Sequence, residues 1–254
     1  MNKLKSIDNL RKKLKSEVSI GSWMQIPSAN IAEIVGNSGY DWAAVDLEHG
    51  HFSKESLPDI FRALELGNTL PFARIAYADP TKCKIALDAG AGGIIIPKIE
   101  TSEQLIQMRD AVRWPPAGKR GVGFSRANLF GKYFEEYSVE SQNPFLVAMI
   151  ESKKGFENID DILSVDGLDA IFIGPYDLSA SIGITGYFDH KEFVNSINLI
   201  KDKCKKNMIP CGIHVVEPSL QELESKINDG YNFLAYSMDS MHLRKGLELV
   251  FKKI

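Results

Sequence analysis

Residues 145–179 read FLVAMIESKKGFENIDDILSVDGLDAIFIGPYDLS, and this stretch contains two successive strand–helix units. Each unit begins with an uninterrupted apolar run, Phe145–Ile150 in the first and Ala170–Ile173 in the second. Strands that are apolar throughout indicate a sheet with both faces buried. Acidic residues follow the runs, Glu151 and Asp177, and two carboxylates at neighbouring strand ends can converge on one divalent cation. Either one alone also suits a turn or a helix cap.

The same alternation extends on both sides of this stretch and gives eight strand–helix units in 254 residues. Strands are predicted at Ser19–Gln25, Trp42–Leu47, Pro71–Ile75, Gly93–Pro97, Phe145–Ile150, Ala170–Ile173, Ile209–Ile213 and Phe233–Tyr236. Helices are predicted at Ala29–Ser38, Lys54–Leu66, Pro80–Ala89, Ser102–Val112, Gly155–Leu163, Lys191–Asn207, Ser219–Asp229 and Ser240–Lys253. With an extra N-terminal helix, this pattern is typical of a single (β/α)8 TIM barrel spanning residues 1–254. An open doubly wound sheet is the alternative, but no G-x-G-x-x-G follows the first strand.

The composition suits one compact domain and carries no electrostatic sign of nucleic-acid binding. The chain is 44% hydrophobic and 25% charged, with a formal net charge of −3. No run approaches the ~18 apolar residues of a membrane span, and the polar N-terminus does not resemble a signal peptide. Cys83, Cys204 and Cys211 lack metal-site spacing and are expected to be reduced thiols. We therefore expect a cytoplasmic protein with neither nucleic-acid nor membrane partners.

One segment, Arg113–Asn143, departs from the regular alternation. It contains Trp114-Pro115-Pro116, the glycine-rich run Lys119–Gly123 and several aromatic residues. The segment is too long for an ordinary strand–helix connection, and long loops in compact domains are usually functional or interfacial.

Polar residues gather at the predicted carboxyl ends of the strands, where the active site of such a barrel lies. In chain order they are Trp23, Gln25, Asp46, Glu48, His49, Arg74, Lys98, Glu100, Glu151, Asp177, His214, Ser237 and Asp239. The set contains a pair of metal ligands, a cation and a candidate base. It predicts a reaction centre for an anionic substrate, with the metal as Lewis acid.

Arg74 and His49 are the candidates for charge stabilisation and proton transfer. A guanidinium at the end of the third strand can bind a carboxylate bidentately or stabilise an oxyanion. The alternative for Arg74 is a structural ion pair with a neighbouring carboxylate. An imidazole beside a carboxylate at a strand end suits acid–base work near neutral pH. His51, two residues further on, is expected to be a solvated bystander.

Five blocks follow one another along the chain: Gly39–Trp42, Asp46–Gly50, Ile96–Thr101, Lys119–Gly123 and Phe172–Ser179. Their sequences, GYDW, DLEHG, IPKIET, KRGVG and FIGPYDLS, resemble those of the 4-hydroxy-2-oxoheptanedioate aldolase family. These are metal-dependent (class II) pyruvate aldolases that include the 2-keto-3-deoxy-sugar-acid aldolases. The similarity runs from about residue 19 to the C-terminus. It implies a (β/α)8 barrel that exchanges its last helix within dimers, commonly assembled as a trimer of dimers.

The resemblance also implies roles for individual residues. Glu151 and Asp177 would hold a divalent cation, Mg²⁺, Mn²⁺ or Co²⁺. Arg74 would stabilise the pyruvate enolate, and His49 would be the acid–base residue, acting through water. Asp88 matches the aspartate that pairs with this histidine in the family, so it joins His49 and Arg74 as an expected catalytic residue.

The expected substrate-binding residues are Trp23, Met149, Gly174, Pro175, Ser179 and His214, with the backbone around Gly174-Pro175 at the pyruvate carboxylate. Two departures from the family pattern bear on the substrate. Met149 stands where glutamine is usual, and a thioether cannot donate a hydrogen bond. His214 and Glu217 replace small apolar residues, and they are expected to be either additional substrate contacts or a fixed loop pair.

The sequence thus predicts a retro-aldol lyase that cleaves a 4-hydroxy-2-oxo acid into pyruvate, or a close 2-oxo acid, and an aldehyde. Metal-assisted decarboxylation of a 2-oxo diacid such as oxaloacetate is one alternative, because it forms the same enolate. A Schiff-base aldolase that uses Lys98 is another. A non-catalytic keto-acid-binding barrel is the third, although a binding protein has no need of a proton-transfer residue.

Overall fold

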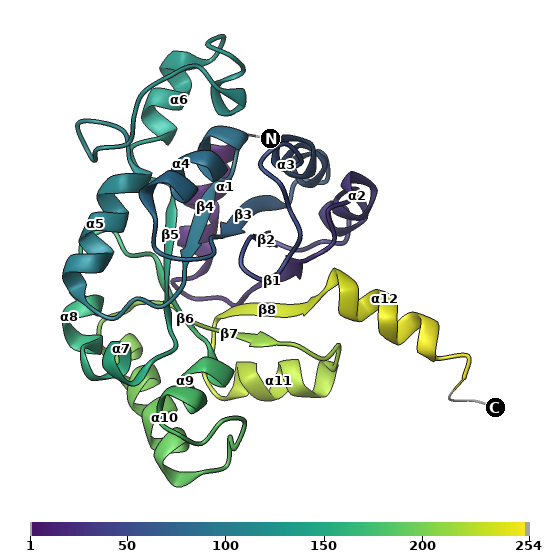
Figure 1. The fold of residues 1–254 in the computed structure, drawn as a ribbon, viewed down its shortest axis with the longest axis vertical. Coiled ribbons are helices and arrows are strands. Elements are labelled where there is room, and N and C mark those ends of the chain that lie inside the picture. The colour runs from purple at the N-terminus through teal and green to yellow at the C-terminus, as the bar shows by residue number, and fades with distance from the viewer. Residues whose placement is uncertain (1, 252–254) are drawn as a thin grey trace.

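The chain folds into a closed barrel of parallel strands, β1 to β8 in sequence order, in a computed structural model that describes residues 2–251. Figure 1 shows the strands at the centre and most of the helices around them. The barrel closes where β8 pairs with β1, with Phe233 opposite Ser19. The strands are β1 (Ser19–Met24), β2 (Trp42–Asp46), β3 (Leu70–Arg74), β4 (Gly93–Ile96), β5 (Phe145–Ile150), β6 (Ala170–Ile173), β7 (Cys211–Val215) and β8 (Phe233–Met238). The predicted (β/α)8 barrel is confirmed.

The helices follow the expected order, with additions in the connections. They are α1 (Lys3–Lys13), α2 (Ala29–Gly36), α3 (Leu57–Leu66), α4 (Pro80–Ala89), α5 (Ser102–Val112), α6 (Phe134–Glu140), α7 (Lys153–Glu157), α8 (Ile159–Leu163), α9 (Pro175–Ser181), α10 (Lys191–Lys206), α11 (Leu220–Asn228) and α12 (Asp239–Glu248). The helix predicted at 155–163 is two short helices. The long segment 113–143 contains α6 and a 3-10 turn, η1 (Arg126–Asn128). Residues 252 and 253 of the last predicted helix lie outside the described part of the chain.

Strand β7 lies two residues further along the chain than predicted. Ile209 was expected to open the strand, but its N–H donates to the carbonyl of Cys204 and so closes the end of α10. Pro210, which has no N–H, then separates the helix from the strand. As a consequence His214 lies within β7 and does not follow it.

The inside of the barrel is filled by large side chains in layers. Helix α1 contributes Ile7, Leu10 and Leu14 to this interior cluster, and all three are buried. Trp42, Phe72, Phe145 and Phe233 stack in the middle of the barrel. Trp23, Met149 and Phe172 belong to the same cluster and also line the cavity at the carboxyl ends of the strands. The packed interior therefore ends as the floor of that cavity.

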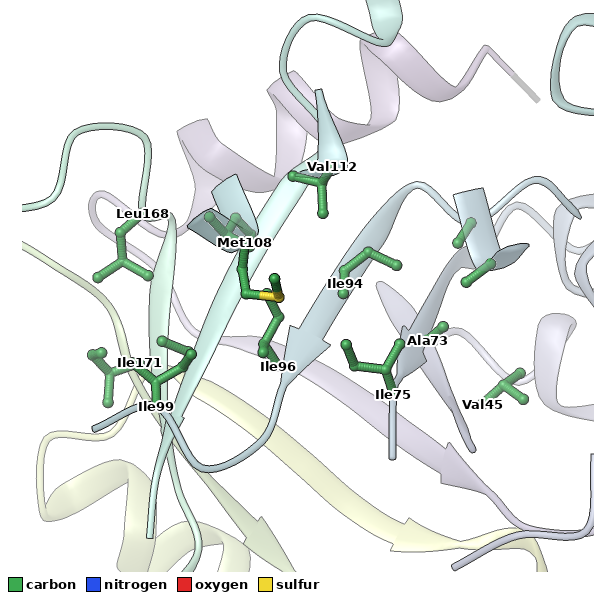
Figure 2. Close-up of a cluster of buried hydrophobic side chains, with 14 of the residues drawn as sticks. Val45, Ala73, Ile75, Ile94, Ile96, Ile99, Met108, Val112, Leu168 and Ile171 are labelled. Atoms are coloured by element: carbon green, nitrogen blue, oxygen red, sulfur yellow. The ribbon is translucent and has the colours of Figure 1, made fainter. Parts of the chain in front are cut away.

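A second apolar layer lies between the strands and the surrounding helices. Figure 2 shows part of it, where Ile94 and Ile96 of β4 face Met108 and Val112 of α5. Burying such side chains stabilises the fold by about 1.5–3 kcal/mol each. Within residues 2–251, no helix is both long and apolar enough to cross a membrane.

Helix α12 departs from the ring of helices. Figure 1 shows it extending away from the barrel toward the C-terminus. Two of its leucines, Leu243 and Leu247, are 52% and 65% exposed. A helix of this kind usually packs an apolar stripe against a neighbour, so α12 offers such a stripe to solvent within a single chain.

Candidate active site

A cavity of about 220 Å³ opens at the carboxyl ends of the strands. Nine residues predicted to act at the site line it: Trp23, His49, Arg74, Met149, Glu151, Gly174, Pro175, Asp177 and His214. They come from all parts of the chain, and the parallel strands bring them to one edge of the barrel. Gln25, Asp46, Phe172, Ile173, Tyr176, Val216 and Met238 complete the lining.

Glu151 and Asp177 lie on adjacent connections, after β5 and in the first turn of α9. Glu151 is buried, and its Oε1 accepts a hydrogen bond from the N–H of Lys98 at 2.7 Å. Its Oε2 lies over Gly174, where an added Cβ would be only 2.6 Å away. Asp177 is exposed and is not the N-cap of α9, since Gly174 holds that position. Helix capping therefore does not account for this carboxylate.

The electrostatics of the pair favour a bound cation. Burial, together with the like charges of Asp177 and Glu48, raises the pKa of Glu151 to about 7. A divalent cation offsets both effects, and carboxylate oxygens are the ligands that hard cations prefer. In residues 2–251 no three His, Cys, Asp or Glu side chains are grouped as a metal site. The protein would thus supply two carboxylates, with water and substrate completing the coordination shell, and this donor set fits the metal predicted from the sequence.

Arg74 at the end of β3 makes two ion pairs and also lines the cavity. Its Nε and Nη2 donate to the two carboxylate oxygens of Asp46 at 3.0 and 2.7 Å. Its Nη1 lies 3.0 Å from Glu48 Oε2. A guanidinium has five N–H donors, so two remain for a ligand. Arg74 is therefore part of a structural ion pair and also lines the cavity.

Asp46 is the central residue that sequence reasoning placed at the strand end but gave no role. Besides Arg74, its Oδ1 accepts the backbone N–H groups of Glu48 and His49 at 3.0 and 3.1 Å. Burial alone would raise the pKa of Asp46, but the hydrogen bonds and charge of Arg74 hold it below its usual value. One buried carboxylate thus orients the guanidinium and the turn that carries His49. In the sequence, the signal for such a role is an acidic residue that directly ends one apolar strand, Asp46, with an arginine, Arg74, that ends the next.

His49 itself lies at the rim of the cavity. Its side chain is exposed and lines the cavity, and its charge is coupled to that of Glu48. Glu48, the residue before it, is half-buried, and burial raises its pKa above the usual value in spite of Arg74. The arrangement leaves His49 free to exchange protons with water or substrate.

His214 lies in the wall of the cavity beside Trp23. Its Nε2 lies 2.9 Å from the carbonyl oxygen of Ser237, and its ring stacks on Trp23 with centroids 5.2 Å apart. Glu217, the other half of the suggested loop pair, forms ion pairs with Lys245 and Arg244 of α12. Met149 contributes a buried thioether to the apolar floor.

Two predicted residues do not join the site within one chain. Asp88 is at the end of α4, which returns the chain to the amino-terminal side of the barrel, and it forms an ion pair with Lys84. It borders a separate surface cavity beside Arg126. Ser179 is fully buried, donates to the carbonyl of Tyr176 and accepts the N–H of Gly186. Ser179 therefore fixes the loop after α9, and a substrate contact is not its role here.

Lys98, the candidate for a Schiff base, points away from the site. Its side chain is exposed and absent from the cavity lining, while only its backbone N–H contacts Glu151. Glu100 is used elsewhere, as the acceptor for the Ser152 hydroxyl at 2.8 Å. Among the described residues that line the cavity there is no lysine, so the lysine mechanism lacks its nucleophile.

Nearly the whole chain is similar to known aldolases. Residues 19–246 match the family model described as HpcH/HpaI aldolase/citrate lyase. A hydroxypyruvate/pyruvate aldolase of Roseobacter denitrificans is 35% identical over 94% of this chain and 93% of its own length. A 2-keto-3-deoxy-L-rhamnonate aldolase of Klebsiella pneumoniae is 34% identical over 98% of this chain and 93% of its own length.

Among solved structures, an HpcH/HpaI aldolase/citrate lyase family protein from Burkholderia cenocepacia superimposes with a TM-score of 0.90. It is 27% identical, and the match covers 96% of this chain and 98% of that protein. The two curated relatives are 34–35% identical over nearly the whole chain, and the family model matches from the first strand to the last helix. Together these matches establish the family. The chain belongs to the HpcH/HpaI aldolase/citrate lyase family and is an aldolase, a carbon–carbon lyase.

Proposed function

We propose that this aldolase depends on a divalent metal held by Glu151 and Asp177 and cleaves a 4-hydroxy-2-oxo acid into pyruvate, or a close 2-oxo acid, and an aldehyde. The observation that carries the proposal is the placement of these two carboxylates beside Arg74 in one small cavity. The relatives named as pyruvate and 2-keto-3-deoxy-L-rhamnonate aldolases support a 2-oxo acid as the substrate. We propose Mg²⁺, Mn²⁺ or Co²⁺ as the metal, because hard and borderline cations suit carboxylate and water ligands.

Arg74 and His49 have separate roles in the proposed reaction. When bound, the cation supplies Lewis-acid polarisation of the 2-oxo group. Arg74 directs its two remaining N–H donors at the oxygen on which negative charge develops. His49 accepts the proton of the 4-hydroxyl through water as the C3–C4 bond breaks and its electrons pass into the 2-oxo acid half. The enolate that results then takes a proton at C3 to give the free keto acid.

The apolar floor excludes water from the reacting carbons. Trp23 and Phe172 lie with their ring centroids 5.5 Å apart, and Met149 fills the space where the family has an amide. We propose that the substrate carboxylate lies against the first turn of α9, which begins at Gly174-Pro175. In a low-dielectric site of this kind, the charge interactions of Arg74 are stronger than they would be in water.

We further propose that the enzyme is a homo-oligomer, a trimer of dimers, in the cytoplasm. The exposed leucines of α12 support association, and three buried, unpaired cysteines suit a reducing compartment. A pair of His49 with Asp88 then has to form between two copies, because α4 carries Asp88 to the other end of its own barrel. Sedimentation velocity decides the point, and a monomer at micromolar concentration would rule out the assembly.

The direct test is a panel of 4-hydroxy-2-oxo acids, with oxaloacetate included, assayed before and after treatment with EDTA and after metal is restored. The proposal predicts aldol cleavage that is lost with chelation and recovered with Mg²⁺, Mn²⁺ or Co²⁺. Decarboxylation of oxaloacetate in the absence of any aldol cleavage would favour the decarboxylase instead. Inactivation by borohydride in the presence of pyruvate, with trapping at Lys98, would indicate a Schiff base.

A further inference from the structure

The His214 imidazole is fixed in one orientation by two contacts. It stacks on Trp23 at an interplanar angle of 25°, and its Nε2 lies 2.9 Å from the Ser237 carbonyl. Ser237 is itself immobilised, since it is fully buried and its hydroxyl donates to the carbonyl of Val216 at 3.0 Å. Its φ of 53° is in the left-handed region, which serine seldom occupies. Strain of this kind is retained where the surrounding structure requires it, typically at functional sites.

The contact with Ser237 determines which ring nitrogen of His214 carries the proton. A backbone carbonyl only accepts hydrogen bonds, so Nε2 must be the donor. In a neutral imidazole the other nitrogen, Nδ1, is then an acceptor. Burial, reinforced by the charge of Arg74, lowers the pKa of His214 to about 4. At neutral pH the ring is therefore uncharged, with Nδ1 unprotonated.

Nδ1 has no hydrogen-bond partner among residues 2–251, and it is not one of the polar atoms sealed inside the protein without a partner. It therefore opens toward space that a ligand can enter. His214 borders the catalytic cavity and also an adjoining cavity of about 320 Å³, lined in part by Tyr176, Phe188 and Tyr231. A substrate bound at Glu151 and Asp177 thus has room to extend along His214.

From this geometry we propose that His214 recognises a hydroxyl group of the substrate, which donates its hydrogen bond to Nδ1. This specificity-determining contact rests on the proposed aldolase function. The substrate class it selects is a hydroxylated one, with the hydroxyl either on the keto acid half or on the aldehyde half. An aliphatic group of the same size leaves Nδ1 desolvated and unpaired, which is unfavourable.

The same surroundings argue against a substrate with an acidic tail at this point. An unprotonated Nδ1 repels a carboxylate oxygen, because both groups are acceptors. Arg74 is already paired with Asp46 and Glu48, and in the lining of the adjoining cavity Lys226 is accompanied by two acidic residues, Glu217 and Glu222. The sequence left a polar or an anionic contact open, and the structure favours the neutral hydroxyl.

The test compares pairs of substrates that differ only in a hydroxyl replaced by methyl. Hydroxypyruvate and 2-oxobutanoate form the pair for the keto acid half. There are two pairs for the aldehyde half. The first is glycolaldehyde and propionaldehyde, and the second, one carbon longer, is 3-hydroxypropanal and butanal. We expect the wild-type enzyme to favour the hydroxylated member of at least one pair by about 10- to 100-fold in kcat/KM. The pair that shows the preference identifies the source of the hydroxyl.

Two variants connect this preference to Nδ1. His214→Phe keeps an aromatic ring for the stack on Trp23 but has no acceptor, so the preference should fall to within about threefold. His214→Asn places an amide oxygen close to the position of Nδ1 and should retain part of the preference. Equal losses for both members of every pair, or a wild-type enzyme indifferent to the hydroxyl, would overturn the proposal.

Exchange of the pyruvate methyl protons for deuterium separates this proposal from the aldolase function itself. The exchange requires enolisation but no second substrate and no contact with a substrate hydroxyl. We expect wild type to exchange at a metal-dependent rate. For each variant the hydroxyl preference is a ratio of two substrates measured on the same protein, so a change in its overall rate does not affect the comparison. Exchange that is intact in wild type while the substrate ranking is unchanged in His214→Phe would refute only the role of His214. A wild-type enzyme that neither exchanges pyruvate nor cleaves any substrate would refute the proposed function.

Discussion

At the scale of single residues, the site depends on the hydrogen bonds that one buried carboxylate, that of Asp46, accepts. Asp46 receives two donors from Arg74 and two backbone N–H groups from the turn that carries His49. Charge-assisted, bidentate pairs of this kind are among the strongest hydrogen-bonding arrangements in proteins. The guanidinium and the turn that carries His49 are therefore positioned together, before any substrate arrives.

The geometry predicts a severe effect for Arg74→Lys, even though the charge is kept. An ammonium cannot reproduce a planar fork that pairs with Asp46 on one side and faces the cavity on the other. We expect kcat to fall by about 10²–10³, as for the loss of one oxyanion donor. Steady-state kinetics of aldol cleavage, with circular dichroism as a check of the fold, provide the measurement. Activity within a few-fold of wild type would leave Arg74 a purely structural role.

His49→Ala should separate two half-reactions. Aldol cleavage requires removal of the 4-hydroxyl proton and should be strongly reduced, by about 10²–10⁴-fold. Enolisation of pyruvate has no such proton to remove and should be largely retained. Both rates are measured on one protein preparation, by pyruvate release and by deuterium exchange. A similar decrease in the two would indicate that His49 only positions the substrate.

His214 gives a pH-dependent contribution to stability whose sign follows from its pKa. The pKa is about 4 in the folded chain and near 6.5 when unfolded. Between these values the unfolded chain binds the additional proton, so stability falls as pH decreases from 6.5 toward 4. At about 1.36 kcal/mol per pH unit, the loss approaches about 3 kcal/mol. It should be absent in His214→Phe, as measured by urea unfolding at pH 7.5 and 4.5; parallel pH profiles would contradict this assignment.

Some of these residues were visible in the sequence and others were not. Glu151, Asp177, Arg74 and His49 follow apolar strands and belong to family-like blocks, so their positions could be predicted. For Asp88 the motif did not reveal that a helix carries it to the other end of its own barrel, so its pairing with His49 stays a prediction that requires a second copy. Ser179 belongs to the same block as Asp177, yet its hydroxyl serves the loop after α9.

At the scale of elements, the turn from β6 into α9 brings together Glu151 and Asp177, the two carboxylates that we propose as metal ligands. Gly174 starts this turn and lies directly against Glu151, so that an added Cβ would be 2.8 Å from the Cβ of Glu151. A contact shorter than 3.0 Å forces one side to move. The absence of a side chain at Gly174 is thus what permits Glu151 to face the cavity.

Gly174→Ala should therefore displace Glu151 and weaken metal binding without unfolding the barrel. We expect the Kd for Mn²⁺, measured by titration calorimetry, to increase at least about tenfold, which corresponds to about 1.4 kcal/mol. Gly246→Ala is the matched control, because nothing lies within 4 Å of its added Cβ. An unchanged Kd in Gly174→Ala, or the same change in both variants, would argue against this role of the turn.

Element boundaries show where local patterns mislead. Strands β5 and β6 were predicted at their observed limits, because their apolar runs end at an acidic residue or a glycine. Strand β7 was placed two residues early, because Ile209 packs as the end of a helix and resembles the start of a strand. Helix α9 was not predicted as an element, since only seven residues follow Gly174 before the next turn.

At the scale of the whole molecule, the barrel converts distance in sequence into proximity at one edge. Trp23 and His214 are stacked although most of the chain lies between them. The interior cluster, with α1 at one end and Trp23 at the other, gives the site a rigid floor. Eight apolar runs that alternate with helical patterns were sufficient to predict this architecture. The direction of α12 does not follow from the apolar pattern. The expectation for this helix came from the family resemblance, which implies a last helix exchanged within dimers, and Leu243 and Leu247 are exposed in the single chain.

The central claim is that Glu151 and Asp177 hold the metal required for chemistry on a 2-oxo acid. The most direct measurement is deuterium exchange of the pyruvate methyl group by EDTA-treated protein, as Mn²⁺ is titrated into wild type and Glu151→Gln. We predict no exchange without metal, saturable recovery in wild type, and little or no recovery in the variant, whose neutral amide is a poor ligand for a hard cation. Full exchange by chelated wild type, or equal recovery in Glu151→Gln, would contradict the account.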